Sequence, residues 1–268
     1  MPAIRLPLEG QTVLNLRAQE DAPALTRALR ALGAAVVERP VLAFAAPSNW
    51  APFDVRAAKF VPGDWIAFTS ATAVRCALSR LAETGREVAS LAQANIAALG
   101  KGTAKAVTEA GLPVRLIPSA HFQSEGLLEA LLAVLAPGEA VWVPRAEQGR
   151  EVLVESLERA GHPVALTPVY RTVTPPEGLG AVPDLLDRAA VDWIVFTSAS
   201  TVTNFLDLLP TGMGNWQDRV RIACLGRVTE EMARQRGLIV AVRPEQQDLD
   251  GLVAAMARVA MSTPAGET

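Results

Sequence analysis

Residues 64–72 read D-W-I-A-F-T-S-A-T and residues 192–200 read D-W-I-V-F-T-S-A-S, so seven of the nine positions are identical. Each stretch is an apolar run that stops at Thr-Ser, and a second apolar segment follows it. A short apolar run bounded by polar residues is typical of a buried parallel strand. A serine directly after such a run predicts the N-cap of a helix. The repeated phrase therefore predicts two similar strand–helix units, with helices that begin near Ala71 and Ala199.

The repeat extends over the whole chain of 268 residues. The two phrases begin at positions 64 and 192, and the same offset in numbering aligns V-L-N-L-R-A at 13–18 with V-W-V-P-R-A at 141–146. Further along, I-A-A-L-G at 96–100 matches I-A-C-L-G at 222–226, with an offset that is smaller by two. Two long repeats in the same order predict two similar domains rather than a solenoid.

Strands alternate with helices within each half of the sequence. The helices expected at Ala22–Leu32 and Glu151–Ala160 carry apolar residues at three-and-four spacing, which is typical of a helix with one buried face. This alternation predicts α/β domains with doubly wound parallel sheets and right-handed connections. A glycine stands where each of four helices should end. These glycines are Gly33, Gly111, Gly161 and Gly237.

Two stretches that begin with proline interrupt the alternation. P-V-L-A-F at 40–44 and P-V-Y-R-T at 168–172 each precede a polar loop with further prolines, which is typical of a connection between domains. If both are connectors, the chain crosses between the domains twice. The expected boundaries are then a discontinuous domain of residues 1–39 plus 174–268, an inserted domain of residues 45–167, and connectors at 40–44 and 168–173.

Composition limits the class of protein. The net charge is −3, so no overall positive field would attract nucleic acid. No apolar run approaches the roughly 20 residues of a membrane span, and the N-terminal residues lack the apolar segment of a signal peptide. We therefore expect a cytoplasmic protein without membrane contact, in which Cys76 and Cys224 are reduced and buried. A disulfide between the two cysteines is the alternative.

Metal and nucleotide chemistry are both disfavoured by the motifs. His121 and His162 show no ligand spacing with each other or with cysteine, so no metal site is expected. G-K-G-T at 100–103 is not a P-loop, because its Gly-Lys is not followed directly by Ser or Thr. The same segment lacks the third glycine of a dinucleotide-binding loop. A different α/β enzyme that uses a nucleotide therefore stays a less favoured alternative.

The ends of the strands predict anion binding. The first N–H groups of a helix have no partner within the helix and carry partial positive charge, so they bind carboxylate or phosphate without lysine. Ser70 and Ser198 mark two such helix starts, and Thr103 and Thr229 mark two others. If the domains face each other, these four ends would line one cleft suited to a ligand with many carboxylates. The alternative is that the serines only cap their helices.

Three further side chains are candidates for the site. Arg17 and Arg145 follow the first strand of each half, where an arginine can bind a carboxylate. A surface ion pair is the alternative for either arginine. Tyr170 is the only tyrosine, and it lies in the second connector, where packing is the alternative to a chemical role.

Taken together, these segments resemble the uroporphyrinogen-III synthase family over nearly the whole chain. The order and spacing of the motifs are more specific than any one of them. The motifs are F-T-S-A at 68–71, A-L-G-K-G-T at 98–103, V-P-R-A-E-Q-G-R at 143–150, P-V-Y-R-T at 168–172, F-T-S-A-S at 196–200 and C-L-G-R-V-T at 224–229. The resemblance implies two flavodoxin-like domains, one of them discontinuous, joined by a two-stranded connector.

The resemblance also implies a reaction. Hydroxymethylbilane, a linear tetrapyrrole octacarboxylate, is closed to uroporphyrinogen III with loss of water and inversion of ring D through a spiro intermediate, as a step of haem biosynthesis. No cofactor is implied. Tyr170 is the residue expected to assist departure of the hydroxyl group. The residues expected to bind the substrate are Ser70, Thr103, Arg145, Ser198 and Thr229.

The last expectations concern partners and the alternative function. We expect a monomer that makes transient contact with the enzyme supplying hydroxymethylbilane. A non-catalytic two-domain binding protein for a polyanionic small molecule is the alternative function, because it too would close on a ligand with many carboxylates.

Overall fold

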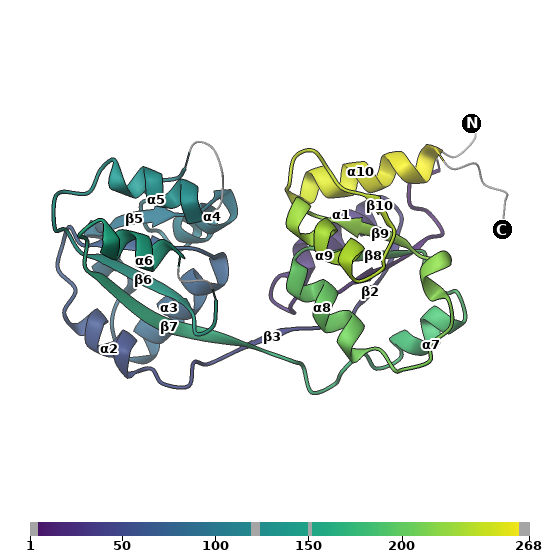
Figure 1. Cartoon of the computed structure of the whole chain (residues 1–268), viewed down its shortest axis with the longest axis horizontal. Coiled ribbons are helices and arrows are strands. Elements are labelled where there is room, and N and C mark those ends of the chain that lie inside the picture. Colours follow the sequence, from purple (N-terminus) through teal and green to yellow (C-terminus); the bar gives the residue numbers. More distant parts are fainter. Residues whose placement is uncertain (1–4, 119–123, 150–151, 263–268) are drawn as a thin grey trace. The chain divides into compact units, whose positions relative to one another are not determined.

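The protein is described from a computed structural model, which describes residues 5–118, 124–149 and 152–262. The chain divides into two compact units (Figure 1). Unit 1 consists of Met1–Ala43 and Val173–Thr268, and unit 2 consists of Phe44–Thr172. The chain therefore passes between the units twice, once after Ala43 and once after Thr172.

Unit 1 is built on a five-stranded sheet in the order β10-β9-β8-β1-β2. All of its strand pairs are parallel. Along the chain of this unit the strand order is that of a flavodoxin-like fold. The strands are β1 Thr12–Asn15, β2 Ala35–Glu38, β8 Trp193–Phe196, β9 Arg221–Cys224 and β10 Val240–Val242. The helices are α1 Ala22–Ala31, α7 Val182–Asp187, α8 Ala199–Leu208, α9 Arg227–Gln235 and α10 Leu249–Ser262.

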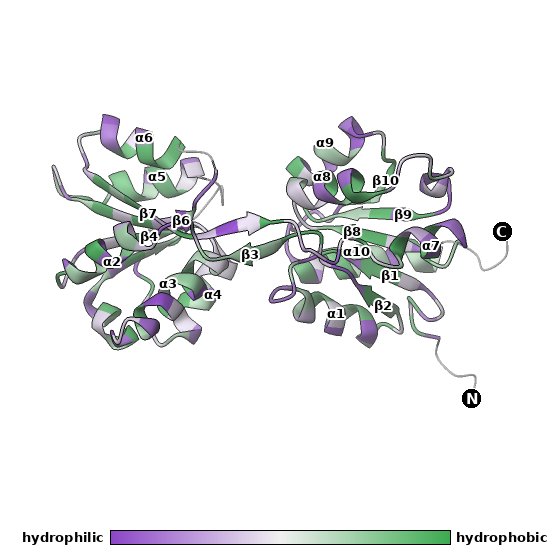
Figure 2. Ribbon diagram, turned by 90° about the horizontal axis from the view of Figure 1, so that it is seen from below, coloured by the Kyte–Doolittle hydropathy of each residue, from purple (hydrophilic) through white to green (hydrophobic). Residues whose placement is uncertain are grey.

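Helices cover both faces of this sheet, as Figures 1 and 2 show. Alternate residues of a strand point to opposite faces, and β8 illustrates the consequence. Ile194 and Phe196 pack in a core with α7, α8 and α9, whereas Trp193 and Val195 pack in a second core with α1 and α10. Because both faces are buried, the strand is apolar throughout, which is why the sequence W-I-V-F has no polar residue.

Unit 2 contains the second five-stranded sheet, in the order β3-β7-β6-β4-β5. One core lies between this sheet and α2, α3 and α4, and another lies between the sheet and α5 and α6. The strands are β3 Ala43–Ala45, β4 Trp65–Phe68, β5 Asn95–Ala98, β6 Val141–Ala146 and β7 Val164–Val173. The helices are α2 Ala51–Ala58, α3 Ala71–Glu83, α4 Lys101–Glu109, α5 Ser124–Leu132 and α6 Val152–Arg159.

The strand registers reproduce the sequence repeat. Val13 lies opposite Trp193 in unit 1, and Val141 lies opposite Trp65 in unit 2. The offset in numbering between Val13 and Val141 is the same as that between Trp65 and Trp193, and it is also the offset between the two quoted phrases. Equivalent positions in the two halves therefore occupy equivalent places in the two sheets, although the chain enters the two sheets at different strands.

Local signals define the ends of the helices. The side chain of Ser70 accepts a hydrogen bond from the backbone N–H of Ala73 at 3.0 Å. Ser198 accepts one from Thr201 N–H at 3.2 Å in a capping box. Both predicted N-caps are thus confirmed. The four glycines expected at helix ends have φ between 77° and 90°, a region that favours glycine because it has no Cβ.

The connector segments differ between the two halves. β7 runs without interruption through its ten residues, whereas the equivalent stretch of the first half is divided into β2 and β3. β3 is a neighbour of β7 in the second sheet, so the two connector segments are joined by hydrogen bonds. The expected two-stranded connector is therefore an extension of the sheet of unit 2.

Two expectations about individual groups can be compared with the structure. Neither cysteine is in a disulfide; Cys224 is buried, but Cys76 is only partly buried, so the expectation of two buried thiols is wrong for Cys76. The helical position of Cys76 on α3 leaves part of its side chain at the surface. His162 is buried, and His121 lies outside the described residues. In the described part of the chain, none of the helices combines the length and apolar character that crossing a membrane requires.

The cysteines give a test of the core. Burial, followed by the charge of Glu230, raises the pKa of the Cys224 thiol from 9.0 to about 12. In the native protein at neutral pH a water-soluble thiol reagent should therefore modify Cys76 and leave Cys224 intact, as read by mass spectrometry. The unfolded thiol ionises first as pH rises, so Cys224 should also contribute a loss of stability between about pH 9 and pH 12.

The single variant Cys76→Ser isolates the buried thiol. It should show no rapid modification until denaturant unfolds unit 1. Labelling of Cys224 in folded Cys76→Ser at the rate of a small thiol would contradict the burial described above.

Candidate active site

The carboxyl ends of β4, β6 and β7 bring several candidate residues of unit 2 to one edge of its sheet. Arg145 lies near the end of β6, opposite Pro168 of β7, and the next pair is Ala146 with Tyr170. The register shift between these pairs is an irregularity of the kind that redirects side chains next to functional sites. Tyr170 therefore follows directly after the one register shift between these two strands.

A cavity of about 210 Å³ opens at this edge. Tyr170 and Arg145 are both in its wall, and its lining includes apolar residues of β6 and α6. The polar residues and the glycine of the wall are Thr69, Ser124, Arg145, Gln148, Gly149 and Tyr170.

Tyr170 is held on two sides. Its ring meets the ring of Phe44 edge-on, with centroids 5.2 Å apart. Its hydroxyl lies 3.3 Å from Oγ of Ser70, which also accepts the N–H of Ala73 in the first turn of α3. The helix start, the serine and the phenol thus form one hydrogen-bonded chain, and the structure brings two predicted site residues that are distant in the sequence into contact.

Arg145 is almost buried, with 8% of its surface exposed. Its Nε donates to the backbone oxygen of Ala146 at 3.1 Å. The guanidinium also lies against Gly149, since a Cβ at that position would be 2.5 Å from Nη2 of Arg145. A nearly buried guanidinium in a cavity wall is a good receiver for a carboxylate, because its planar donors match the two oxygens.

The two threonines lie at helix starts that lack the capping side chain found at the serine positions. Thr103 and Thr229 are in the first turns of α4 and α9, and both are buried. The N-cap residues of these helices are Gly100 and Gly226, and neither helix has a side-chain cap. First-turn N–H groups without a capping side chain are the donors that an anion would use.

Unit 1 has the same arrangement of parallel strands and helix starts as unit 2, but some of the side chains differ. Ser198 caps α8, and its Oγ lies 2.9 Å from Oγ of Ser200. The offset of the repeat makes Leu42 the equivalent of Tyr170, so no phenol stands at this place in unit 1. Arg17 forms an ion pair with Asp21, with Nη2 3.8 Å from Oδ2. The ion-pair alternative considered for the two arginines therefore applies to Arg17.

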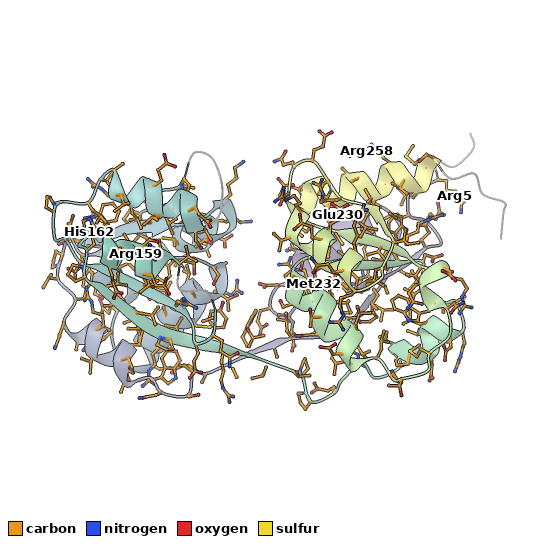
Figure 3. The ribbon with its side chains drawn as sticks, in the orientation of Figure 1. Arg5, Arg159, His162, Glu230, Met232 and Arg258 are labelled. Atoms are coloured by element: carbon orange, nitrogen blue, oxygen red, sulfur yellow. The ribbon has the colours of Figure 1, made fainter. Side chains whose placement is uncertain are left out.

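Two further ionisable groups have structural contacts. Hydrogen bonds from Arg243 and Arg234 lower the pKa of Glu230, which follows Thr229 on α9 (Figure 3). His162 lies near the amino end of β7, away from the candidate edge, and its Nδ1 is 3.0 Å from the backbone oxygen of Glu139 (Figure 3). Within residues 5–118, 124–149 and 152–262, no group of three His, Cys, Asp or Glu side chains could hold a metal ion.

Among the polar and glycine residues of the cavity wall, four were not predicted from the sequence, namely Thr69, Ser124, Gln148 and Gly149. A signal existed for three of them. Thr69 is in the repeated phrase itself, and Gln148 and Gly149 are in the motif at 143–150. Ser124 follows residues 119–123, which lie outside the described part, and no pattern in the sequence marks it.

The comparison with protein families identifies the family of the chain. The model for uroporphyrinogen-III synthase HemD matches residues 23–254. The chain belongs to the uroporphyrinogen-III synthase family. A uroporphyrinogen-III synthase from Synechococcus elongatus is 34% identical over 266 residues, which cover 96% of this chain and 98% of the relative. One from Chlorobaculum parvum is 26% identical over 240 residues, which cover 89% and 94%.

Solved structures show the same fold. A mutant uroporphyrinogen III synthase from Thermus thermophilus superposes with a TM-score of 0.62 at 22% identity, covering 94% of this chain and 100% of the other. Uroporphyrinogen-III synthetase from Helicobacter pylori gives a TM-score of 0.60 at 17% identity, covering 94% and 99%. The expected α/β fold with parallel sheets is confirmed. The family is that of a cyclising hydro-lyase of porphyrin biosynthesis.

The two serine caps lead to a stability prediction. Ser70→Ala and Ser198→Ala should each lower the free energy of unfolding by about 1 kcal/mol, because each removes an acceptor for a first-turn N–H group. Denaturant unfolding followed by tryptophan fluorescence measures the change. Ser79→Ala, an exposed change within α3, is the control and should alter stability by less than about 0.5 kcal/mol. Equal effects of all three changes would contradict the capping role.

Proposed function

We propose that the edge of unit 2 carries the reacting end of the substrate, with Tyr170 as the proton donor. The family reaction closes hydroxymethylbilane to uroporphyrinogen III with loss of water and inversion of ring D through a spiro intermediate. The observation that supports the proposal is the position of the Tyr170 hydroxyl. Tyr170 is in the wall of a cavity, and its hydroxyl lies 3.3 Å from Oγ of Ser70, at the carboxyl edge where ligands of α/β sheets bind.

The chemistry requires little more than positioning and one proton. When the hydroxyl of ring A leaves, an electron-rich cation remains that is already reactive, and uncatalysed closure gives the uninverted isomer. The enzyme must therefore fold the tetrapyrrole so that this cation meets the substituted carbon of ring D, and must exclude water meanwhile. A proton donor beside the departing hydroxyl speeds the first step.

In this proposal a hydrogen bond from Ser70 orients the hydroxyl group of Tyr170. A serine hydroxyl has one hydrogen and two acceptor sites. Since Oγ of Ser70 accepts from Ala73 N–H, its own hydrogen is available to the oxygen of Tyr170. A hydrogen bond donated by Ser70 would orient the phenol, and in this proposal the departing hydroxyl of the substrate accepts the proton of Tyr170.

The substrate carboxylates are held by local charge and by backbone donors in this proposal. Arg145 receives a carboxylate in the cavity of unit 2, and N–H groups near Ser70 and Thr103 receive others. Ser198 and Thr229 supply the equivalent helix starts of unit 1. These attractions are local, so a chain with a net charge of −3 can bind a polyanion. The expectation that all of these residues line one common cleft stays a prediction.

We further propose that the protein acts in the cytoplasm as a monomer and takes hydroxymethylbilane through transient contact with the enzyme that produces it. The support is chemical. A substrate that closes spontaneously to the wrong isomer benefits from a short transfer time.

An isomer assay separates this function from that of a non-catalytic binding protein. Hydroxymethylbilane is incubated with the protein, the products are oxidised, and isomers I and III are resolved by chromatography. The enzyme should produce isomer III well above the uncatalysed level. Isomer I alone, at the uncatalysed rate, would favour the binding protein.

Tyr170→Phe is the most specific change at the site. It should lower kcat for isomer III about tenfold or more, because it removes a positioned acid, while the ring keeps its contact with Phe44. Ser70→Ala should have a smaller effect, since it removes a hydrogen bond that orients the phenol but leaves the acid itself. Thr103→Ala should also have a smaller effect, since carboxylate binding is shared among many donors and water can replace one of them. The measurement is steady-state formation of isomer III by each variant.

Near-normal turnover by Tyr170→Phe would limit Tyr170 to packing. Catalysis would then rest on positioning alone, and the hydrogen bond to Ser70 would have no role in the reaction.

A further inference from the structure

One carboxylate of unit 2 joins two loops near the candidate site. Glu147 follows β6, and its Oε2 accepts the backbone N–H of Ser48 at 3.1 Å and the hydroxyl of Ser48 at 3.2 Å. Ser48 lies in the segment that follows β3, far from Glu147 in the sequence. The backbone N–H of Glu147 donates to the backbone oxygen of Tyr170 at 2.7 Å. Glu147 thus binds the strand of Tyr170 through its backbone and the neighbouring loop through its side chain.

The same loop contacts the tyrosine at its other end. Phe44 is the middle residue of β3, and its ring meets the Tyr170 ring edge-on with centroids 5.2 Å apart. Between Phe44 and Ser48, the backbone oxygen of Ala46 accepts a hydrogen bond from Nε of Arg171 at 3.1 Å. The segment 44–48 therefore packs against the phenol ring at its first residue and is bonded to Glu147 at its last.

The equivalent positions of unit 1 hold residues that cannot make the same bonds. The offset of the repeat relates Glu147 to Gln19 and Ser48 to Pro176. Proline has neither an N–H group nor a hydroxyl, so it can donate neither bond. Gln19 and Pro176 instead line a cavity of about 420 Å³ within unit 1. The loop bonded by a carboxylate thus belongs to the unit that contains the phenol.

We propose that Glu147 is a positioning residue for Tyr170. Its carboxylate holds Ser48, and through this loop it keeps the ring of Phe44 against the phenol and fixes the direction of the phenol ring. Among the described residues that form the wall of the cavity beside Tyr170, neither Glu147 nor Ser48 occurs, so the role is indirect. The proposal rests on the proposed function, in which Tyr170 donates the proton.

The physical basis is the dependence of proton transfer on geometry. A displacement of about 1 Å at a reacting group can lower a rate on the order of 100-fold. Surface loops are mobile unless their backbone is bonded, and Ser48 is exposed. Hydrogen bonds to a charged acceptor are stronger than those between neutral groups. Glu147 therefore limits the positions that this loop, and with it Phe44, can take.

The first test observes the phenol directly and needs no substrate. Tyr170 is the only tyrosine of the chain, so protein with isotope-labelled tyrosine gives one set of ring signals in an NMR spectrum. The ring current of Phe44 contributes to these signals, and Phe44→Leu shows where they lie without it. In Glu147→Ala the signals should move toward the positions found in Phe44→Leu. Signals that stay at the wild-type positions in Glu147→Ala would overturn the proposal.

Glu139 offers a matched control. Like Glu147 it is a partly buried loop carboxylate of unit 2, and its Oε2 accepts the backbone N–H of Ala136 at 2.9 Å. It precedes β6, so it lies at the amino end of the strand whose carboxyl end leads to Glu147. Glu139→Ala should leave the tyrosine signals unchanged. The same movement of the signals in both variants would show a general loss of structure and would overturn a specific role of Glu147.

The second test separates positioning from substrate binding. Glu147→Ala should lower kcat for isomer III about fivefold and change KM by less than about twofold, because it disturbs the acid and not the cavity wall. Glu147→Gln should keep kcat within about twofold of wild type, because its amide oxygen can accept the same two bonds. In the Tyr170→Phe background, Glu147→Ala should change kcat by less than about twofold, since the hydroxyl that it positions is gone.

Two kinetic results would overturn the positioning role. One is a fivefold loss from Glu147→Ala that persists in Tyr170→Phe, since the effect would then not pass through the phenol. The other is a kcat of Glu147→Gln as low as that of Glu147→Ala, since the charge and not the hydrogen bonds would then matter.

Ser48→Pro covers the case in which Glu147→Ala does not fold. It removes both donors and copies the Pro-Pro pair at 175–176 of unit 1. Its ring signals and kcat should change in the same direction as those expected for Glu147→Ala, and wild-type values of both would overturn the proposal. Wild-type protein that forms no isomer III would overturn the proposed function itself, whereas the ring signals would still decide whether Glu147 positions Tyr170.

Discussion

The parallel pairing of fully buried strands is the constraint on which the rest of the structure depends. In a parallel sheet every strand ends at the same edge, and each is followed by a segment that returns over a face. The strands Trp65–Phe68 and Trp193–Phe196 are buried at all four positions, so no polar group lies within them. Polar side chains and unpaired N–H groups are therefore collected at the carboxyl edge, where α3, α4, α8 and α9 begin.

Because the two units share one arrangement of strands and helix starts, a difference in side chain between equivalent positions indicates a difference in role. Both sheets present a capping serine, a buried threonine and an arginine at equivalent positions. Among the equivalent positions that differ in their chemistry, Tyr170 corresponds to Leu42, and Gly149 corresponds to Asp21. In the proposed function the first of these differences gives unit 2 the reactive character, because it adds a proton donor there. The arrangement of strands and helix starts is thus common to both units, whereas the proposed function assigns the proton donor to unit 2.

Much of the fold could be predicted because its signals are local or repeated. The helix starts at Ser70 and Ser198 and the helix ends at four glycines follow from backbone geometry within a short stretch of chain. The offset of the sequence repeat carried over to the strand registers because both sheets bury the same pattern. The partial exposure of Cys76 was missed because an apolar neighbourhood in sequence does not say which side of a helix meets the core.

The site was less predictable, since it depends on contacts between distant residues. The hydrogen bond between Ser70 and Tyr170 joins two residues that are far apart in the sequence, and Tyr170 lies just after a register shift between β6 and β7. A surface ion pair of Arg17 was an open alternative, but its partner Asp21 was not named, because spacing on the chain allows such a pair without requiring it. The cavity wall likewise combines β6, β7 and loops whose proximity no local pattern encodes.

The central claim is that the carboxyl edge of unit 2 holds the reacting end of the tetrapyrrole. A crystal structure of the protein with bound uroporphyrinogen III tests this claim most directly. The account predicts a pyrrole carboxylate on the guanidinium of Arg145, with the Tyr170 hydroxyl facing the ring system and remaining in contact with Ser70. A tetrapyrrole that leaves this cavity empty, or whose carboxylates contact Arg17 and not Arg145, would contradict it.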